Sequence, residues 1–162
     1  MTHTAEPQHR SAPEQARLDA AQIELFERHT CFNQVLGLKV VQLRPQMVVR
    51  FDMRPDLVGH HHYQRLHGGV ISATLDALGG GAVLSAVIDK HPGESTDQAM
   101  ARFLKIGTID LRVDYLRPGL GQHFVASAEV TRLGGRVAST HCRLHNDDGV
   151  LIATASAAYI MS

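Results

Sequence analysis

The sequence of 162 residues lacks several features that would place it in other classes of protein. It carries no net charge, because 16 lysines and arginines balance 16 aspartates and glutamates, and a neutral chain is a poor general binder of nucleic acid. No run approaches the ~18 apolar residues of a membrane span. The two cysteines, Cys31 and Cys142, form no CxxC pair and no zinc-ligand spacing. Free thiols without a secretion-type N-terminus predict a cytoplasmic protein.

Apolar residues make up 44% of the chain, which is enough for one well-packed core. Residues 1–10 are polar and show no period, so we expect a flexible tail there and a single domain over 11–162. A Ser11 cap, Pro13 in the first turn and Glu14 at the capping-box position start a helix predicted over 13–29. Two short strands, 36–43 and 47–53, are predicted to form a hairpin, followed by a loop over 54–66.

The segment 68–89 is the longest apolar stretch and predicts one buried helix. Three successive glycines at 79–81 cost helix propensity, ~1 kcal/mol each relative to alanine. We infer that they let another part of the backbone approach closely. The polar residues 91–100 that follow are predicted to form a loop.

Period-two alternation dominates the rest of the chain, beginning with Ile109, Leu111, Val113 and Tyr115, which alternate with charged residues. Strands are predicted from 106 to 115 and over 123–133, 136–145 and 150–161, and tight turns are expected to join them into an antiparallel meander. About six antiparallel strands wrapped around one long helix, with a further N-terminal helix, make an α+β fold.

The start of the long helix carries the sequence Leu66-His-Gly-Gly. Gly68 and Gly69 fall where backbone N–H groups lack helical partners, and the helix dipole adds positive potential. This arrangement suits a carbonyl or oxyanion. The alternative is that His67 caps the helix and the glycines form a tight turn.

Asp76 lies within the same apolar helix, where a carboxylate is costly unless it is paired, hydrogen-bonded or functional. Eight residues separate it from Gly68, about 12 Å along a helix. One small reacting centre can hardly touch both groups of one chain. We therefore expect them to act on one bond from two copies, as a homodimer or a homotetramer with a two-fold interface.

The stretch LHGGVISATLDALGG resembles the signature of hotdog-fold acyl-CoA thioesterases of the phenylacetate-pathway (PaaI) type. Gly107 to Gly119, GTIDLRVDYLRPG, is similar to the following strand in that family, especially in its medium- and long-chain (YigI-like) branch. The element order matches over roughly residues 30–161. The resemblance implies a hotdog fold and hydrolysis of acyl-CoA thioesters to a free acid and CoA, with no cofactor and no metal.

The resemblance also implies roles for individual residues. The Gly68 N–H binds the thioester carbonyl, and Asp76 activates water or attacks the carbonyl itself. Thr108 orients the water, and His67 shapes the turn. The family often has an asparagine six or seven residues before that histidine; here His60 and His61 stand in its place and could donate to the carbonyl instead.

Basic residues in the second half of the chain could meet the phosphates of CoA. Residues 101–145 contain seven lysines and arginines but only three acids. Arg117, Arg132 and Arg136, beside the predicted turns, are the candidates for phosphate contacts. The alternative is that they are solvated strand residues.

Three other functions compete with the hydrolase. A non-catalytic acyl-CoA-binding or sensing module would not need a carboxylate beside a carbonyl site. A hydratase or dehydratase usually pairs a histidine with a nearby acid, which His67 matches poorly. His60, His61 and His62 could hold a transition metal, but adjacent residues on a loop point in different directions and no other ligands stand nearby. The absence of GxSxG argues against a serine nucleophile.

Overall fold

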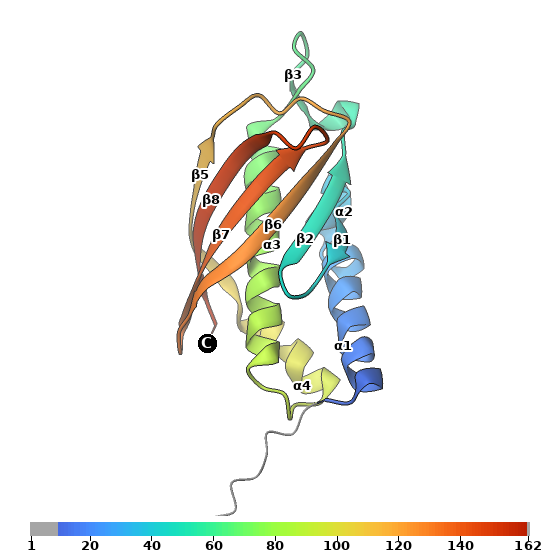
Figure 1. The fold of residues 1–162 in the computed structure, drawn as a ribbon, viewed down its shortest axis with the longest axis vertical. Helices are drawn as coiled ribbons and strands as arrows, with labels where there is room; N and C mark the ends of the chain where they lie inside the picture. Colours follow the sequence, from blue (N-terminus) through green and yellow to red (C-terminus); the bar gives the residue numbers. More distant parts are fainter. Residues whose placement is uncertain (1–9, 162) are drawn as a thin grey trace, which may run out of the picture.

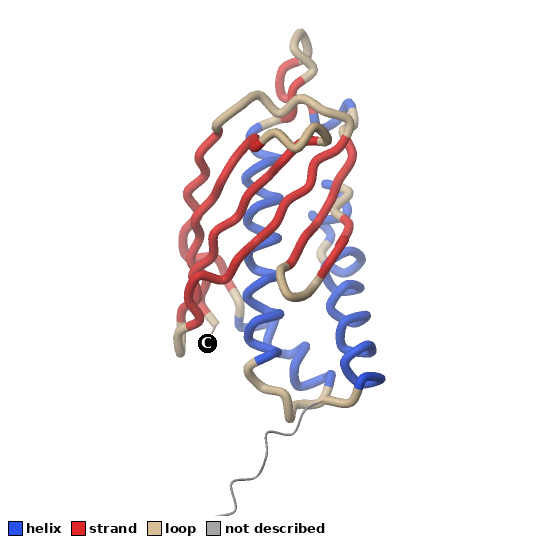
Figure 2. The backbone as a smooth tube through the Cα atoms, in the orientation of Figure 1, coloured by secondary structure: helices blue, strands red, loops and turns tan. Residues whose placement is uncertain are grey.

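A six-stranded antiparallel sheet wraps around one long helix in the computed structural model, which describes residues 10–161 (Figures 1 and 2). The helix is α3 (Gly68–Asp89), and the strands follow the order β1-β2-β6-β7-β8-β5. Their bounds are β1 (Lys39–Gln42), β2 (Met47–Asp52), β5 (Gly107–Tyr115), β6 (His123–Leu133), β7 (Val137–Asn146) and β8 (Leu151–Ile160). The predicted hotdog architecture is confirmed. The prediction that the four strands after α3 form a simple meander is wrong, because β5 lies at the far edge and pairs with β8, while β6 pairs with β2.

Helix α3 is buried because it has little polar surface to offer water. By length and composition α3 could cross a membrane, although no membrane span is predicted from the sequence. In the fold, 67% of its most apolar stretch is buried. The concave face of the sheet covers it with alternating inward residues, among them Phe51 and Phe124, whose rings stack with centroids 5.3 Å apart. A long apolar helix is thus the core element around which the strands close.

The N-terminal segment packs along α3 as a second helical layer (Figure 1). Helix α1 (Ala12–Glu24) continues as a π-helical turn, η1 (Leu25–His29), close to the predicted span 13–29. The Ser11 N–H donates to the Glu14 carboxylate at 3.0 Å, as the capping pattern predicts. Arg10, assigned by sequence to the tail, donates to the His91 carbonyl at 2.7 Å; residues 1–9 lie outside the described part of the chain.

Short elements occupy segments for which the sequence predicted other structure. Residues 31–36 form helix α2 (Cys31–Leu36), which ends at Gly37 with φ 73°, so the strand expected from 36 begins only at Lys39. The predicted loop 54–66 holds a 3₁₀ turn, η2 (Pro55–Leu57), and two strands, β3 (Val58–His60) and β4 (Arg65–Leu66). The predicted loop 91–100 leads into α4 (Thr96–Ala101) and η3 (Arg102–Lys105). Such short pieces show too few residues for a period to emerge.

Two of the three successive glycines of α3, Gly79 and Gly81, allow close approach to the sheet, but side chains approach there and not the backbone expected from the sequence. A Cβ atom at Gly79 would overlap the hydroxyl of Tyr159 on β8, and a Cβ at Gly81 would lie 2.7 Å from the Met47 sulfur on β2. The Tyr159 hydroxyl is fixed by its hydrogen bond, whereas the end of Met47 is flexible. Gly79 is therefore the position where α3 and the sheet are in closest contact.

We predict that Gly79→Ala destabilises the protein by about 1–3 kcal/mol, because the added methyl overpacks the contact with Tyr159 although alanine favours helix. Urea unfolding measures the change. Gly93→Ala is the matched control, since a Cβ there meets nothing within 4 Å, and its free energy of unfolding should stay unchanged. Equal stability of both variants would contradict the close contact.

Candidate active site

Two hydroxyl groups hold the carboxylate of Asp76, which lies half-buried in the third turn of α3. The Thr108 hydroxyl donates to Asp76 Oδ1 at 2.8 Å. The Tyr159 hydroxyl donates to the main-chain oxygen of Asp76 at 2.9 Å and lies 3.4 Å from the same Oδ1. Both donors reach one carboxylate oxygen, and the other, Oδ2, accepts no hydrogen bond from residues 10–161. The carboxylate is positioned without any charged partner among residues 10–161.

A β-bulge at Ile109 aims Thr108 at Asp76. Strand β5 pairs with β8 so that Leu111 lies opposite Ala157, but Thr108 lies opposite Tyr159, with the register shifted between Thr108 and Asp110. The extra residue reverses the alternation of β5 at this end. The alternation predicted from sequence puts Ile109 on the inner face; instead its side chain is 55% exposed and Thr108 turns toward the helix.

Tyr159 was not among the residues singled out by the sequence. It is buried on the inner face of β8, where Ala153, Ala155 and Ala157 precede it at alternating positions. Burial raises the pKa of its hydroxyl, and the nearby negative charge of Asp76 raises it further. Tyr159 therefore stays protonated and acts as a donor. A single tyrosine that follows alternating inward alanines, on a strand facing a glycine-rich helix, is the sequence pattern that could have predicted this contact.

The N-terminus of α3 has one donor committed and one free. The Gly69 N–H donates to His67 Nδ1 at 2.8 Å, so His67 caps the helix, which is one of the two interpretations of this motif. The Gly68 N–H has no acceptor within residues 10–161. The Tyr115 hydroxyl, at the far end of β5, donates to the Gly68 carbonyl at 3.1 Å. Gly68 is thus fixed in place with its N–H available.

A largely apolar cavity of about 180 Å³ begins at Asp76 and Thr108. It lies between α3 and the N-terminal helical segment, and its apolar side chains come from several elements: Leu25, Phe26, Met47, Leu84, Phe103 and Ile106. Gln22 also contacts the cavity and is only 2% exposed, whereas Thr108 is exposed. The cavity therefore opens beside the carboxylate and ends inside the protein.

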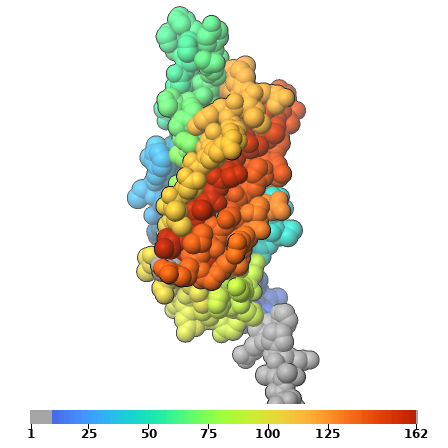
Figure 3. Space-filling model, turned by 90° about the vertical axis from the view of Figure 1, so that its left-hand side faces the viewer, coloured from blue at the N-terminus to red at the C-terminus, as the bar shows by residue number. Residues whose placement is uncertain are grey.

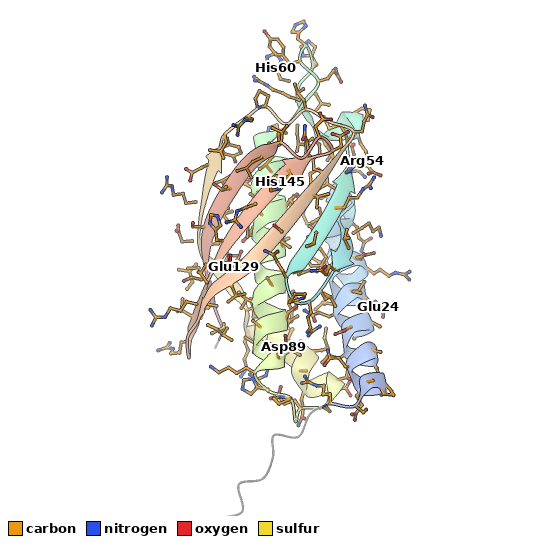
Figure 4. All side chains as sticks on the ribbon, in the orientation of Figure 1. Glu24, Arg54, His60, Asp89, Glu129 and His145 are labelled. Carbon is orange, nitrogen blue, oxygen red and sulfur yellow. The ribbon has the colours of Figure 1, made fainter. Side chains whose placement is uncertain are left out.

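The other predicted site residues lie apart from Asp76 within one chain. His60 and His61 stand at the projecting tip formed by β3 and β4, with ring centroids 6.1 Å apart (Figure 4). Within the described range, no three His, Cys, Asp or Glu side chains are grouped so as to hold a metal ion. Arg117 follows β5 and donates to the Leu151 carbonyl at 3.1 Å. Arg132 and Arg136 flank the β6–β7 turn at the opposite end of the sheet and are exposed.

Comparisons with known proteins agree with this geometry. Residues 63–153 match the Thioesterase superfamily. The chain is 39% identical over 139 residues to the medium/long-chain acyl-CoA thioesterase YigI of Salmonella typhimurium, and 37% identical to that of Escherichia coli K12. Each alignment covers 85% of this chain and 90% of the relative. The chain belongs to the thioesterase superfamily.

A solved structure from Shewanella oneidensis, described as related to the thioesterase superfamily, superimposes with a TM-score of 0.87 at 36% identity. The match covers 94% of this chain and all of that one. The family and the enzyme class predicted from the sequence, a thioesterase, are thereby confirmed.

The two cysteines of this thioesterase differ in their accessibility. Cys142 is buried, and its sulfur lies 3.7 Å from the Leu75 carbonyl oxygen. Burial raises the pKa of the Cys142 thiol to about 11. Cys31 is exposed at the start of α2.

At pH 8 only about one Cys142 thiol in a thousand is ionised, given a pKa near 11. We predict that a thiol reagent modifies Cys31 in the native protein and Cys142 only after unfolding, as followed by mass spectrometry of peptides. Rapid native modification of Cys142 would contradict its burial.

Proposed function

We propose that this thioesterase hydrolyses acyl-CoA thioesters to a free acid and CoA at a site shared between two copies of the chain. One observation carries the proposal: the Asp76 carboxylate lies at the mouth of an apolar cavity with one oxygen held by Thr108. The free N–H of Gly68 lies eight residues earlier on the same straight helix, about 12 Å away. The two groups can serve one carbonyl only if they come from different copies.

The chemistry needs one base and one oxyanion donor. Asp76 Oδ2 takes a proton from water as the water oxygen bonds to the thioester carbon, and the Gly68 N–H of the second copy stabilises the oxyanion. The C–S bond then breaks, and the proton passes from Asp76 to the departing CoA sulfur. The hydroxyls of Thr108 and Tyr159 hold Oδ1 throughout, which favours Asp76 as base over Asp76 as nucleophile.

Strand β5 is the element through which two copies would join. It is a free edge of the sheet and runs uncovered along one side of the molecule (gold in Figure 3). A nine-residue edge strand with an exposed Ile109 is a template for pairing with another strand. If a two-fold axis passes through Leu111, Asp110 of each copy would lie opposite Arg112 of the other copy. The charges along the two edge strands would then be complementary.

This pairing would assemble the separated parts of the site. Tyr115, bonded to Gly68 in its own chain, would lie opposite Gly107 of the other copy, next to Thr108 and Asp76. Arg136 lies at the Thr108 end of the sheet, because its carbonyl accepts from the Met161 N–H just beyond β8. Arg117 at the far end would join it from the second copy, giving two cations for the CoA phosphates.

The relatives named above support the substrate class, since their names specify medium- and long-chain acyl-CoA. The apolar cavity supports it independently, because it can take the hydrocarbon tail of a thioester whose carbonyl is at Asp76.

We predict that Asp76→Asn lowers kcat at least ~100-fold with substrate binding largely kept, because the amide cannot accept the proton of water. Steady-state assays on a panel of acyl-CoA esters measure the effect, with Asp148→Asn on the exposed β7–β8 turn as control. If Asp76→Asn hydrolyses within a few-fold of the unchanged protein, Asp76 is not the base, and a module that only binds acyl-CoA becomes the better explanation.

Complementation tests the shared site. Gly68→Pro removes the free N–H and is compatible with the fold, because proline suits the first helical position and His67 before it already has ψ 135°. A Cβ at this position meets the Tyr115 ring at 3.4 Å, close to an ordinary contact. When Gly68→Pro and Asp76→Asn chains are refolded together, half of the dimers are mixed, and each mixed dimer has one site with neither lesion. We therefore predict recovery of about a quarter of the normal activity.

Light scattering provides the check on assembly, with the expectation that no 17.7 kDa monomer is present. A mixture as inactive as its parents, although mixed dimers are demonstrated by mass, would refute the sharing of Gly68 and Asp76.

A further inference from the structure

The cavity beside Asp76 has a wall and an end that nothing in the thioesterase chemistry requires. It follows α3 from Asp76 to Leu84, eight residues further, a path of about 12 Å. Gly80 contributes to its wall and Gln22 to its buried end. Each of these two residues has a feature that packing of the fold alone leaves unexplained.

Gly80 has no steric reason to be glycine. A Cβ at Gly79 would overlap Tyr159, and a Cβ at Gly81 would lie 2.7 Å from Met47, so both neighbours are needed for close approach. A Cβ at Gly80 would instead meet the Tyr159 ring at 3.6 Å, an ordinary contact. Glycine is unfavourable in a helix interior, so its presence here calls for another cause. The space that a side chain at Gly80 would fill is the cavity.

Gln22 closes the inner end of the cavity with a fixed amide. Its Nε2 donates to the Ser85 hydroxyl, and its Oε1 lies 3.5 Å from the guanidinium of Arg44. Arg44 is itself held by Asp19 and by Asp89, the latter at 2.8 Å. A polar side chain that is 2% exposed and anchored in this way forms a rigid floor under an otherwise apolar cavity.

We propose that Gly80 sets the width and Gln22 the depth of the acyl-chain pocket, so that these two residues determine which acyl-CoA esters are hydrolysed. The proposal rests on the proposed function, because it places the thioester carbonyl at Asp76 and the hydrocarbon tail along α3. A tail short enough to end before Gln22 is fully buried, whereas a longer tail meets the amide and must bend or displace it.

Gly80→Leu fills the pocket wall and tests the width. We expect kcat/KM for hexanoyl- and decanoyl-CoA to fall at least about tenfold relative to acetyl-CoA, since one methylene changes discrimination by such factors. Gly80→Ala should act in the same direction with a smaller effect, while its Tm rises by about 2–4 °C because helix propensity improves. Gly93→Ala, remote from the cavity and unobstructed, is the control with unchanged selectivity.

Gln22→Ala and Gln22→Leu test the depth. Alanine removes the floor, so we expect kcat/KM for palmitoyl-CoA to rise several-fold relative to hexanoyl-CoA; leucine keeps nearly the same size and should keep the original preference. The neighbours remain bonded in both variants, because Ser85 also donates to the Gly81 carbonyl at 3.3 Å and Arg44 keeps its two aspartates.

The outcomes separate this proposal from the proposed function. Suppose that the unchanged protein hydrolyses acyl-CoA esters, and that Gly80→Leu and Gln22→Ala show the same preference for acyl-chain length as the unchanged protein. The pocket assignment is then wrong, and the thioesterase proposal stands. If the unchanged protein hydrolyses none of the esters, the proposed function fails.

Binding of decanoate then decides the pocket without turnover. A rise in Tm with decanoate in the unchanged protein that is lost in Gly80→Leu supports the assignment. Equal shifts in both proteins, or none in either, would overturn it.

Discussion

The contact between Gly79 of helix α3 and Tyr159 of strand β8 is the constraint on which the site depends. Only a residue without a side chain lets the tyrosine hydroxyl come close enough to bond the main-chain oxygen of Asp76. The same hydroxyl reaches the Asp76 carboxylate, so helix and sheet are held together at the residue proposed as the base. The distance between α3 and the sheet and the position of the carboxylate are set by one interaction.

The proposed role of Asp76 as a base depends on its uncharged hydrogen-bond partners. A cation beside it would hold the carboxylate in an ion pair and weaken it as a base, whereas two hydroxyl donors orient it and leave one oxygen free. The cost of placing a carboxylate in an apolar helix is offset by these bonds and by partial exposure to the cavity. An activated carbonyl such as a thioester needs no stronger nucleophile than water polarised in this way.

The N-terminal segment, which is the least diagnostic part of the sequence, supplies one side of the cavity. The π-helical turn brings Leu25 and Phe26 against α3, and Gln22 from the preceding turn closes the inner end. Arg44 connects this segment to the rest of the fold through Asp19 on α1 and Asp89 at the end of α3. The N-terminal segment, which adds no strand to the central sheet, therefore forms one wall of the pocket.

The sequence by itself determined the long buried helix, the approximate positions of the main strands along the chain and the positions of Gly68 and Asp76 on one helix, because periodicity and spacing are local properties of the chain. It also indicated close approach at the glycines 79–81, which the structure shows at Gly79 and Gly81 but not at Gly80. It did not determine the order of the strands in the sheet, since β5 pairs with β8 and not with β6, which follows it in the chain. It did not determine that Thr108 faces Asp76, since alternation along β5 predicts the opposite face and only pairing with β8 introduces the bulge that reverses it. Tyr159, Tyr115 and Gln22 lie 83, 47 and 63 residues along the chain from their partners Asp76, Gly68 and Ser85. Such contacts exist only once the chain has folded.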